Sequence, residues 1–132
     1  MDTRVSLKRI LCWTDKLLSY RLALMITFFL FLVVGLLALT PLAKALLKPL
    51  ATNWADHFLA FACISFFIPT VKPKYALRVA ACCLVYGGAI EVLQPFVHRH
   101  ADWSDFLADS LGIIFGVSSG LIFYLMRKDS VS

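Results

Sequence analysis

The sequence predicts an all-α integral membrane protein with four transmembrane helices and a basic amphipathic helix before them. Of the 132 residues, 61% are hydrophobic and only 16% are charged, and the mean hydropathy is +0.82. A soluble domain is usually nearer half apolar and a quarter charged. One soluble core of this length cannot bury so much apolar surface. Long apolar runs between basic segments complete the pattern, so lipid is the natural solvent of this chain.

The net charge of +5 and the pI of about 9.2 do not indicate a nucleic-acid-binding protein. The basic residues lie between apolar runs and form no single patch. The length allows one membrane domain of about four helices, which we place at residues 22–128 after a cytoplasmic segment at 1–21. The four cysteines include no CxxC pair, so they indicate no disulfide framework.

The segment at residues 1–21 has five basic and two acidic side chains, with apolar residues interleaved at roughly helical spacing. This pattern is typical of a basic amphipathic helix that lies on an anionic inner leaflet. A solvated basic tail that only orients the protein fits the same residues equally well.

Four apolar runs are predicted to span the membrane. The first, at about 22–42, is longer than the hydrophobic region of a signal peptide, so we read it as a retained span. The second covers 54–71 when it takes Asp56 and His57 into the membrane edge, although its shorter apolar part would also suit a re-entrant segment. The third and fourth lie at about 75–97, where Pro95 can end or bend the helix, and at about 106–126.

The positions of Lys and Arg predict that both termini are cytoplasmic. With four spans and the N-terminus inside, the cytoplasmic segments 1–21, 72–78 and 127–128 hold ten of the thirteen Lys and Arg. The positive-inside rule favours this orientation. A re-entrant second segment would move three of these cations to the outside.

Polar residues gather at the predicted outer ends of three spans: Asp56, His57, Glu91, Gln94, Arg99, Asp102, Asp105 and Asp109. Glu91 and Gln94 are three residues apart and share a helix face, as do Asp105 and Asp109, which are four apart. A carboxylate inside a span is costly, so Glu91 is the strongest functional candidate. Arg99 is its expected partner, and a purely structural Glu–Arg pair is the main alternative.

The helix face with Asp105 and Asp109 continues inward through Gly112, Gly116 and Gly120. Glycines at this spacing allow helices to approach closely in lipid. We therefore expect the third and fourth spans to form a tight hairpin with the carboxylates at its outer end.

Three segments in this region resemble the VanZ-like family of small bacterial membrane proteins: NWADHFLAFACISFF (53–67), GGAIEVLQPF (87–96) and RHADWSDFLADSLGIIFG (99–116). Family members carry Asp-Lys-x-x-His-Phe, then Glu-x-x-Gln, then Arg-x5-Asp-x-x-Ala-Asn-x-x-Gly. Asn53 and Trp54 stand in place of the Asp-Lys pair, and Asp109 in place of the Asn. The matching positions keep the family spacing: His57, Phe58, Glu91, Gln94, Arg99, Asp105, Ala108 and Gly112.

The resemblance implies a multi-pass protein of the bacterial cytoplasmic (inner) membrane that acts in the cell envelope. The name-giving members lower susceptibility to the glycopeptide teicoplanin by a route that altered peptidoglycan precursors do not explain. We therefore expect an antibiotic-resistance role in which the protein binds or shields an outer-leaflet ligand, such as a lipid-linked wall intermediate or a glycopeptide antibiotic. Membrane lipids are further expected partners, nucleic acid is not, and assembly as a homo-oligomer stays open.

In a binding protein, a polar head would be held by Glu91, Arg99 and Asp105, while Phe58, Phe61 and Phe96 contact an acyl or prenyl chain. Asp56, Gln94 and Asp109 are further candidate ligand-binding residues. The charge balance favours amine-bearing ligands, because five carboxylates face three cations on the outer side. A phosphate would need protonated acids, a bridging divalent cation or a lysine from the first loop.

The alternative is an intramembrane enzyme that acts on a lipid-linked envelope intermediate. His57 and Glu91 would form a general base–acid pair, Arg99 would stabilise negative charge, and Asp105 would orient His57 or Arg99. A metal variant would use His57 with two carboxylates and leave one coordination position open. No Ser or Cys occupies an obvious nucleophile position, which counts against an enzyme. Catalysis and the identity of any cofactor or metal stay open. A proton-linked transporter ranks last, because the polar groups do not continue to the inner side.

Overall fold

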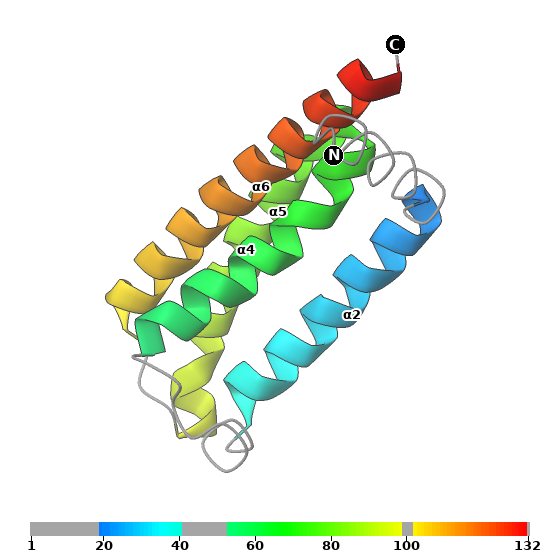
Figure 1. The fold of residues 1–132 in the computed structure, drawn as a ribbon. Coiled ribbons are helices and arrows are strands. Elements are labelled where there is room, and N and C mark those ends of the chain that lie inside the picture. The colour runs from blue at the N-terminus through cyan, green and yellow to red at the C-terminus, as the bar shows by residue number, and fades with distance from the viewer. Residues whose placement is uncertain (1–18, 41–52, 99–101, 132) are drawn as a thin grey trace, which may run out of the picture.

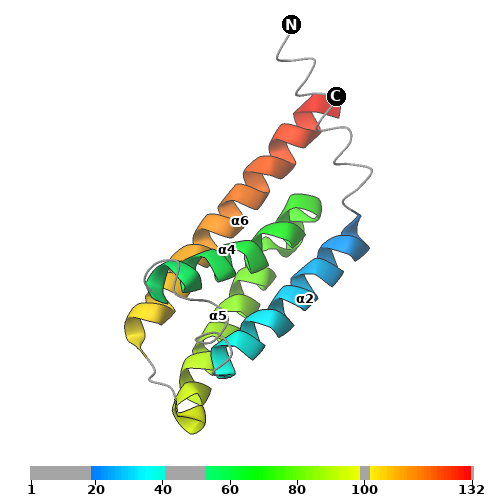
Figure 2. The ribbon, with the colours of Figure 1, turned by 60° about the horizontal axis from the view of Figure 1, so that its bottom comes forward.

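The computed structural model describes residues 19–40, 53–98 and 102–131, which form a bundle of four antiparallel helices (Figures 1 and 2). The helices are α2 (Tyr20–Leu39), α4 (Asn53–Val71), α5 (Ala76–Leu93) and α6 (Trp103–Val131), and the 3-10 turns η1 (Pro73–Tyr75) and η2 (Gln94–Val97) flank α5. All four helices, α5 together with its flanking turns, are long and apolar enough to cross a membrane. This confirms an all-α, multi-pass membrane protein. The predicted amphipathic segment at 1–21 lies almost entirely outside the described residues.

Capping groups and prolines determine where the helices begin and end. The Ser19 hydroxyl oxygen accepts the backbone N–H of Leu22 at 3.2 Å and caps α2. The second apolar run is one continuous helix, α4, as the four-span prediction requires. Pro95 cannot donate a helical hydrogen bond, so α5 ends at Leu93 and the chain continues as η2, which confirms the predicted effect of this proline. His98 then takes a left-handed conformation, with φ 58°.

Three glycines of α6 pack against the backbone of α4. A Cβ atom at Gly112 would collide with the carbonyl oxygen of Phe58, one at Gly116 would collide with that of Ala62, and Gly120 approaches α4 in the same way. The prediction that this face joins the third and fourth spans is therefore wrong, because it contacts the second span. Small residues at helical spacing indicate that another helix packs closely on that face, but they do not indicate which helix.

The buried core lies between α4, α5 and α6, and α2 packs on one side of it. The hydroxyl of Tyr86 in α5 donates a hydrogen bond to the Phe31 carbonyl oxygen and so attaches α2. Phe61 is only 1% exposed, so it offers no surface to an external acyl chain, contrary to the prediction. The buried cluster consists of Phe61, Ile64, Ile68, Val79, Cys83, Ile90 and Ile113.

Charged side chains of the described segments divide between the two ends of the bundle. The first residue of α2 and the last of α6 lie at the same end (Figure 1). That end carries every Lys and Arg of these segments: Arg21, Lys72, Lys74, Arg78, Arg127 and Lys128. The opposite end carries all of their carboxylates except Asp129: Asp56, Glu91, Asp102, Asp105 and Asp109.

Candidate functional site

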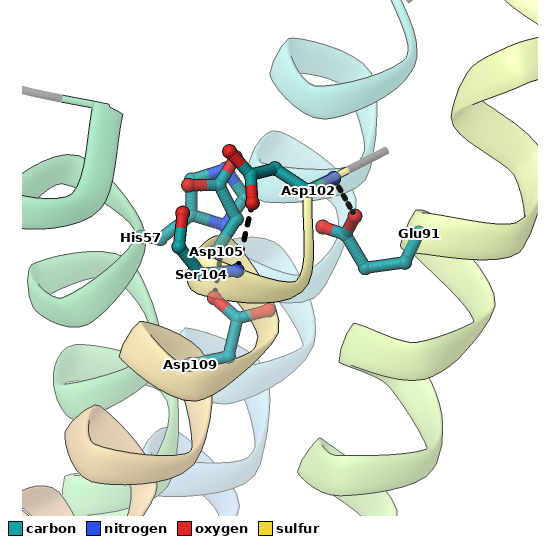
Figure 3. Close-up of polar contacts among 6 residues, drawn as sticks. All are labelled: His57, Glu91, Asp102, Ser104, Asp105 and Asp109. Atoms are coloured by element: carbon teal, nitrogen blue, oxygen red, sulfur yellow. Dashed lines mark hydrogen bonds and ion pairs between the residues drawn. The ribbon is translucent and has the colours of Figure 1, made fainter. Parts of the chain in front are cut away.

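His57, in the second turn of α4, lies between two aspartates of α6. Its Nδ1 is 2.9 Å from Asp109 Oδ1, and its Nε2 is 3.7 Å from Asp105 Oδ2 (Figure 3). The two aspartates are four residues apart, so they follow each other on the same face of α6. Carboxylates at both ring nitrogens fix the orientation of the imidazole and match its capacity to donate twice when protonated.

Glu91 reaches the same cluster from α5. One ligand atom from each of His57, Glu91 and Asp109 lies within 4.8 Å of the others. Glu91 Oε2 also accepts the backbone N–H of Asp102 at 3.0 Å, which ties α5 to the start of α6 (Figure 3). Its predicted partner, Arg99, lies outside the described residues, so that pairing stays a prediction.

Asp102 caps the start of α6, the helix that carries Asp105 and Asp109. Its Oδ1 accepts the backbone N–H of Ser104 at 2.9 Å. The hydrogen bonds from the Ser104 backbone and side chain hold the pKa of the Asp102 carboxyl below its ordinary value. This exposed carboxylate therefore remains an acceptor for the Ser104 N–H at neutral pH.

Gly87 provides the space in which Asp109 lies. A Cβ atom at this position would be 2.9 Å from Asp109 Oδ2 and 3.3 Å from the ring of Phe61. Gly87 precedes Glu91 by four residues, so the two share one face of α5. The sequence predicts that shared face, whereas the contact with Asp109 follows only from the packing of α5 against α6.

An apolar groove of about 300 Å³ lies beside Glu91, between α5 and α6. Its wall is formed by Gly88, Glu91, Val92, Trp103 and Phe106. Glu91 therefore belongs both to the polar cluster and to the groove. The groove was not predicted from the sequence. The sequence does contain a signal for it. Gly88 and Glu91 are three residues apart, as are Trp103 and Phe106, so each pair shares one helix face.

The other predicted binding residues do not contribute to the contacts of the cluster. Asp56 is exposed on α4. The ring of Phe58 packs against Trp54 and Phe115, with centroid distances of 5.8 and 5.7 Å, and does not line the groove. Gln94 is buried, and its Oε1 has no hydrogen-bond partner among the described residues. Of the seven predicted site residues that the structure describes, it brings together four: His57, Glu91, Asp105 and Asp109.

Comparisons with models of known protein families, with curated proteins and with solved structures gave no match for this chain. The polar cluster and the groove that adjoins it therefore provide the basis for a functional hypothesis. Both lie at the end of the bundle opposite the described Lys and Arg.

Proposed function

We propose that this protein is a VanZ-like membrane protein of the bacterial envelope that binds an amphiphilic ligand at the acidic end of its bundle. The observation that carries the proposal is the dual position of Glu91, which contributes to the polar cluster and also to the wall of the apolar groove. A ligand with a polar head and an apolar chain would contact both at once. Binding sites commonly combine an apolar wall with a few polar groups that orient the ligand.

The charge distribution supports an orientation in which this site faces away from the cytoplasm. All Lys and Arg of the described segments lie at the other end of the bundle. Basic loops are retained on the cytoplasmic side of bacterial membranes. The proposed location is therefore the cytoplasmic (inner) membrane, with both termini inside and the ligand taken from the outer leaflet.

Topology reporters test this orientation directly. Alkaline phosphatase, which is active only outside the cytoplasm, should be active when fused after His98 and inactive when fused after Asp129. Green fluorescent protein should give the opposite pattern at the same two positions. Phosphatase activity at Asp129 together with none at His98 would place the site in the cytoplasm and contradict the proposal.

The ligand is an envelope amphiphile, either a lipid-linked wall intermediate or a glycopeptide antibiotic with an acyl chain. The volume of the groove, about 300 Å³, is at the lower end of the range of roughly 300–1,000 Å³ that ligand sites occupy. It suits part of one chain and leaves the head beside Glu91. By binding or shielding such a ligand, the protein would lower susceptibility to teicoplanin, as the resemblance to VanZ-like proteins implies.

A second candidate function, intramembrane acid–base catalysis, is favoured by the contact between His57 and Asp109. A carboxylate 2.9 Å from Nδ1 sets the tautomer of the imidazole and raises its basicity at Nε2. Such a histidine can accept a proton from a reacting group. The two functions differ in one observable, because an enzyme converts its ligand whereas a binding protein releases it unchanged.

The binding proposal is tested by antibiotic susceptibility in a sensitive bacterial host. We expect the wild-type protein to raise the inhibitory concentration of teicoplanin several-fold, with a smaller effect on vancomycin, which lacks an acyl chain. Glu91→Gln should return it to the empty-vector level, because this change removes the negative charge and retains an oxygen that can accept the Asp102 N–H. Amounts of protein in the membrane are matched by immunoblotting.

The groove is tested with a matched pair of tryptophan substitutions on α5. Val92 lines the groove and is 67% exposed, whereas Val85 is 75% exposed on the same helix and lies outside the groove. Val92→Trp should abolish teicoplanin protection by filling the groove, and Val85→Trp should preserve it. Equal loss in both variants, or protection that survives Val92→Trp, would contradict binding in the groove.

A further inference from the structure

Two buried carboxylate oxygens at the site have no hydrogen-bond partner among the described residues: Glu91 Oε1 and Asp109 Oδ2. The Asp109 side chain is only 1% exposed, and its other oxygen is already in contact with His57. A buried acceptor without a donor costs about 1–3 kcal/mol, and more when it is charged. Such atoms need a proton, a bound water or a cation.

The side chains that carry these oxygens lie close together. In Figure 3, the carboxylate of Asp109 extends toward α5, and that of Glu91 extends back toward His57 and Asp109. One oxygen or nitrogen atom from each of these three side chains lies within 4.8 Å of the other two. One imidazole nitrogen and two carboxylate oxygens are a set that zinc accepts, with the fourth position of its tetrahedron left to water or a ligand.

Asp105 completes the arrangement from outside the ligand set. His57 Nδ1 faces Asp109, so Nε2 is the nitrogen available to a second partner, and it lies 3.7 Å from Asp105 Oδ2. A histidine that binds a metal through one nitrogen usually donates the N–H of the other to a carboxylate, which fixes the ring and raises its basicity. Both nitrogens of His57 face carboxylates, so a cation would take the place of the proton between Nδ1 and Asp109 and leave Nε2 to Asp105.

We propose that His57, Glu91 and Asp109 bind a divalent cation, zinc by their chemistry, and that Asp105 positions His57 for it. The cation neutralises two carboxylates that otherwise meet within the low-dielectric end of the bundle. The metal site shares Glu91 with the proposed amphiphile site, but its test needs only the cation and no amphiphile.

The test measures zinc bound to the purified full-length protein in detergent micelles. After incubation with zinc chloride and desalting, mass spectrometry of the element should give one zinc ion per chain for the wild type. His57→Ala and Glu91→Gln should each remove the bound zinc. Asp105→Asn should weaken zinc binding about 10–100-fold without abolishing it, as expected for a partner outside the ligand set.

Two matched controls separate this site from adventitious binding. His98→Asn removes an exposed histidine near the same end of the bundle and keeps a residue that tolerates the left-handed backbone there. Asp129→Asn removes an aspartate from the far end of α6. Both controls should retain the zinc of the wild type.

Thermal unfolding provides a second measurement that does not depend on desalting. Zinc should raise the unfolding temperature of the wild type and of both controls, and should leave that of His57→Ala and Glu91→Gln unchanged. Zinc that is absent from the wild type, or that is lost in His98→Asn and kept in His57→Ala, would overturn the proposal. If the wild type binds no zinc, the two oxygens are satisfied by a proton or by water. If zinc is lost only in His98→Asn, it binds at surface histidines.

Discussion

Gly112→Ala is expected to lower the free energy of unfolding by about 2–3 kcal/mol, a large loss for the addition of one methyl group. The new Cβ would collide with the carbonyl oxygen of Phe58, and the backbone of α4 cannot move aside as a flexible side chain could. The two helices must therefore separate at this turn. The loss exceeds the gain of about 1 kcal/mol that Ala normally brings over Gly within a helix. Titration with denaturing detergent, followed by circular dichroism, measures the difference.

Gly88→Ala is the matched control for this prediction. A Cβ atom at Gly88 would lie 3.7 Å from the ring of Phe106, which is an ordinary van der Waals distance. The same chemical change should therefore leave stability unchanged or raise it slightly. If Gly112→Ala and Gly88→Ala have the same effect, close contact between α4 and α6 does not stabilise the bundle.

His57→Leu is expected to destabilise the metal-free protein by about 3 kcal/mol, because it leaves Asp109 buried without its partner. Asp109→Leu should have a smaller effect, since His57 still has Asp105 at its other nitrogen and is itself partly exposed. The double variant should be more stable than the sum of the two single losses predicts. Well-packed apolar residues often replace a buried charged pair with little loss.

A double-mutant cycle on these variants, measured in the presence of a chelator, gives the coupling energy between the two side chains. We expect a coupling of about 1–3 kcal/mol, within the range found for residues in direct contact. Additive effects within about 0.5 kcal/mol would mean that the 2.9 Å contact contributes nothing to stability. The stability of His98→Asn provides the reference for loss of a histidine that has no carboxylate partner within the described segments.

The sequence predicted which residues form the site better than it predicted the helix packing that supports them. Length and hydropathy predicted the four spans, and strict alternation of direction then placed the polar ends of three spans on the same side of the membrane. Because Asp105 and Asp109 are four residues apart, one helix face carries both, and His57 fits between them. The spans and the shared face needed only helix geometry and the cost of a charge in lipid, whereas the place of His57 between the aspartates came from the structure.

The choice of neighbours among the helices was not predictable in the same way. The glycines of α6 would serve equally well against α4 or α5, and only the complete packing selects α4. The role of Gly87 beside Asp109 depends on the same choice, as does the groove between Gly88 and Phe106. A one-dimensional pattern identifies a surface suited to packing, whereas its partner is determined by the shapes of all the surfaces together.

The groove beside Glu91 is open to the outside of the bundle, since Val92 and Trp103 in its wall are 67% and 84% exposed. In a membrane, a ligand enters such a groove by lateral diffusion, so occupancy follows the mole fraction of the ligand in the bilayer. Each added methylene favours partitioning into the bilayer by about 0.8 kcal/mol. The apparent affinity, expressed against aqueous concentration, therefore rises about fourfold per methylene without any new contact to the protein. Selectivity for longer acyl chains would then arise from partitioning of the ligand into the membrane and not from contacts with the protein.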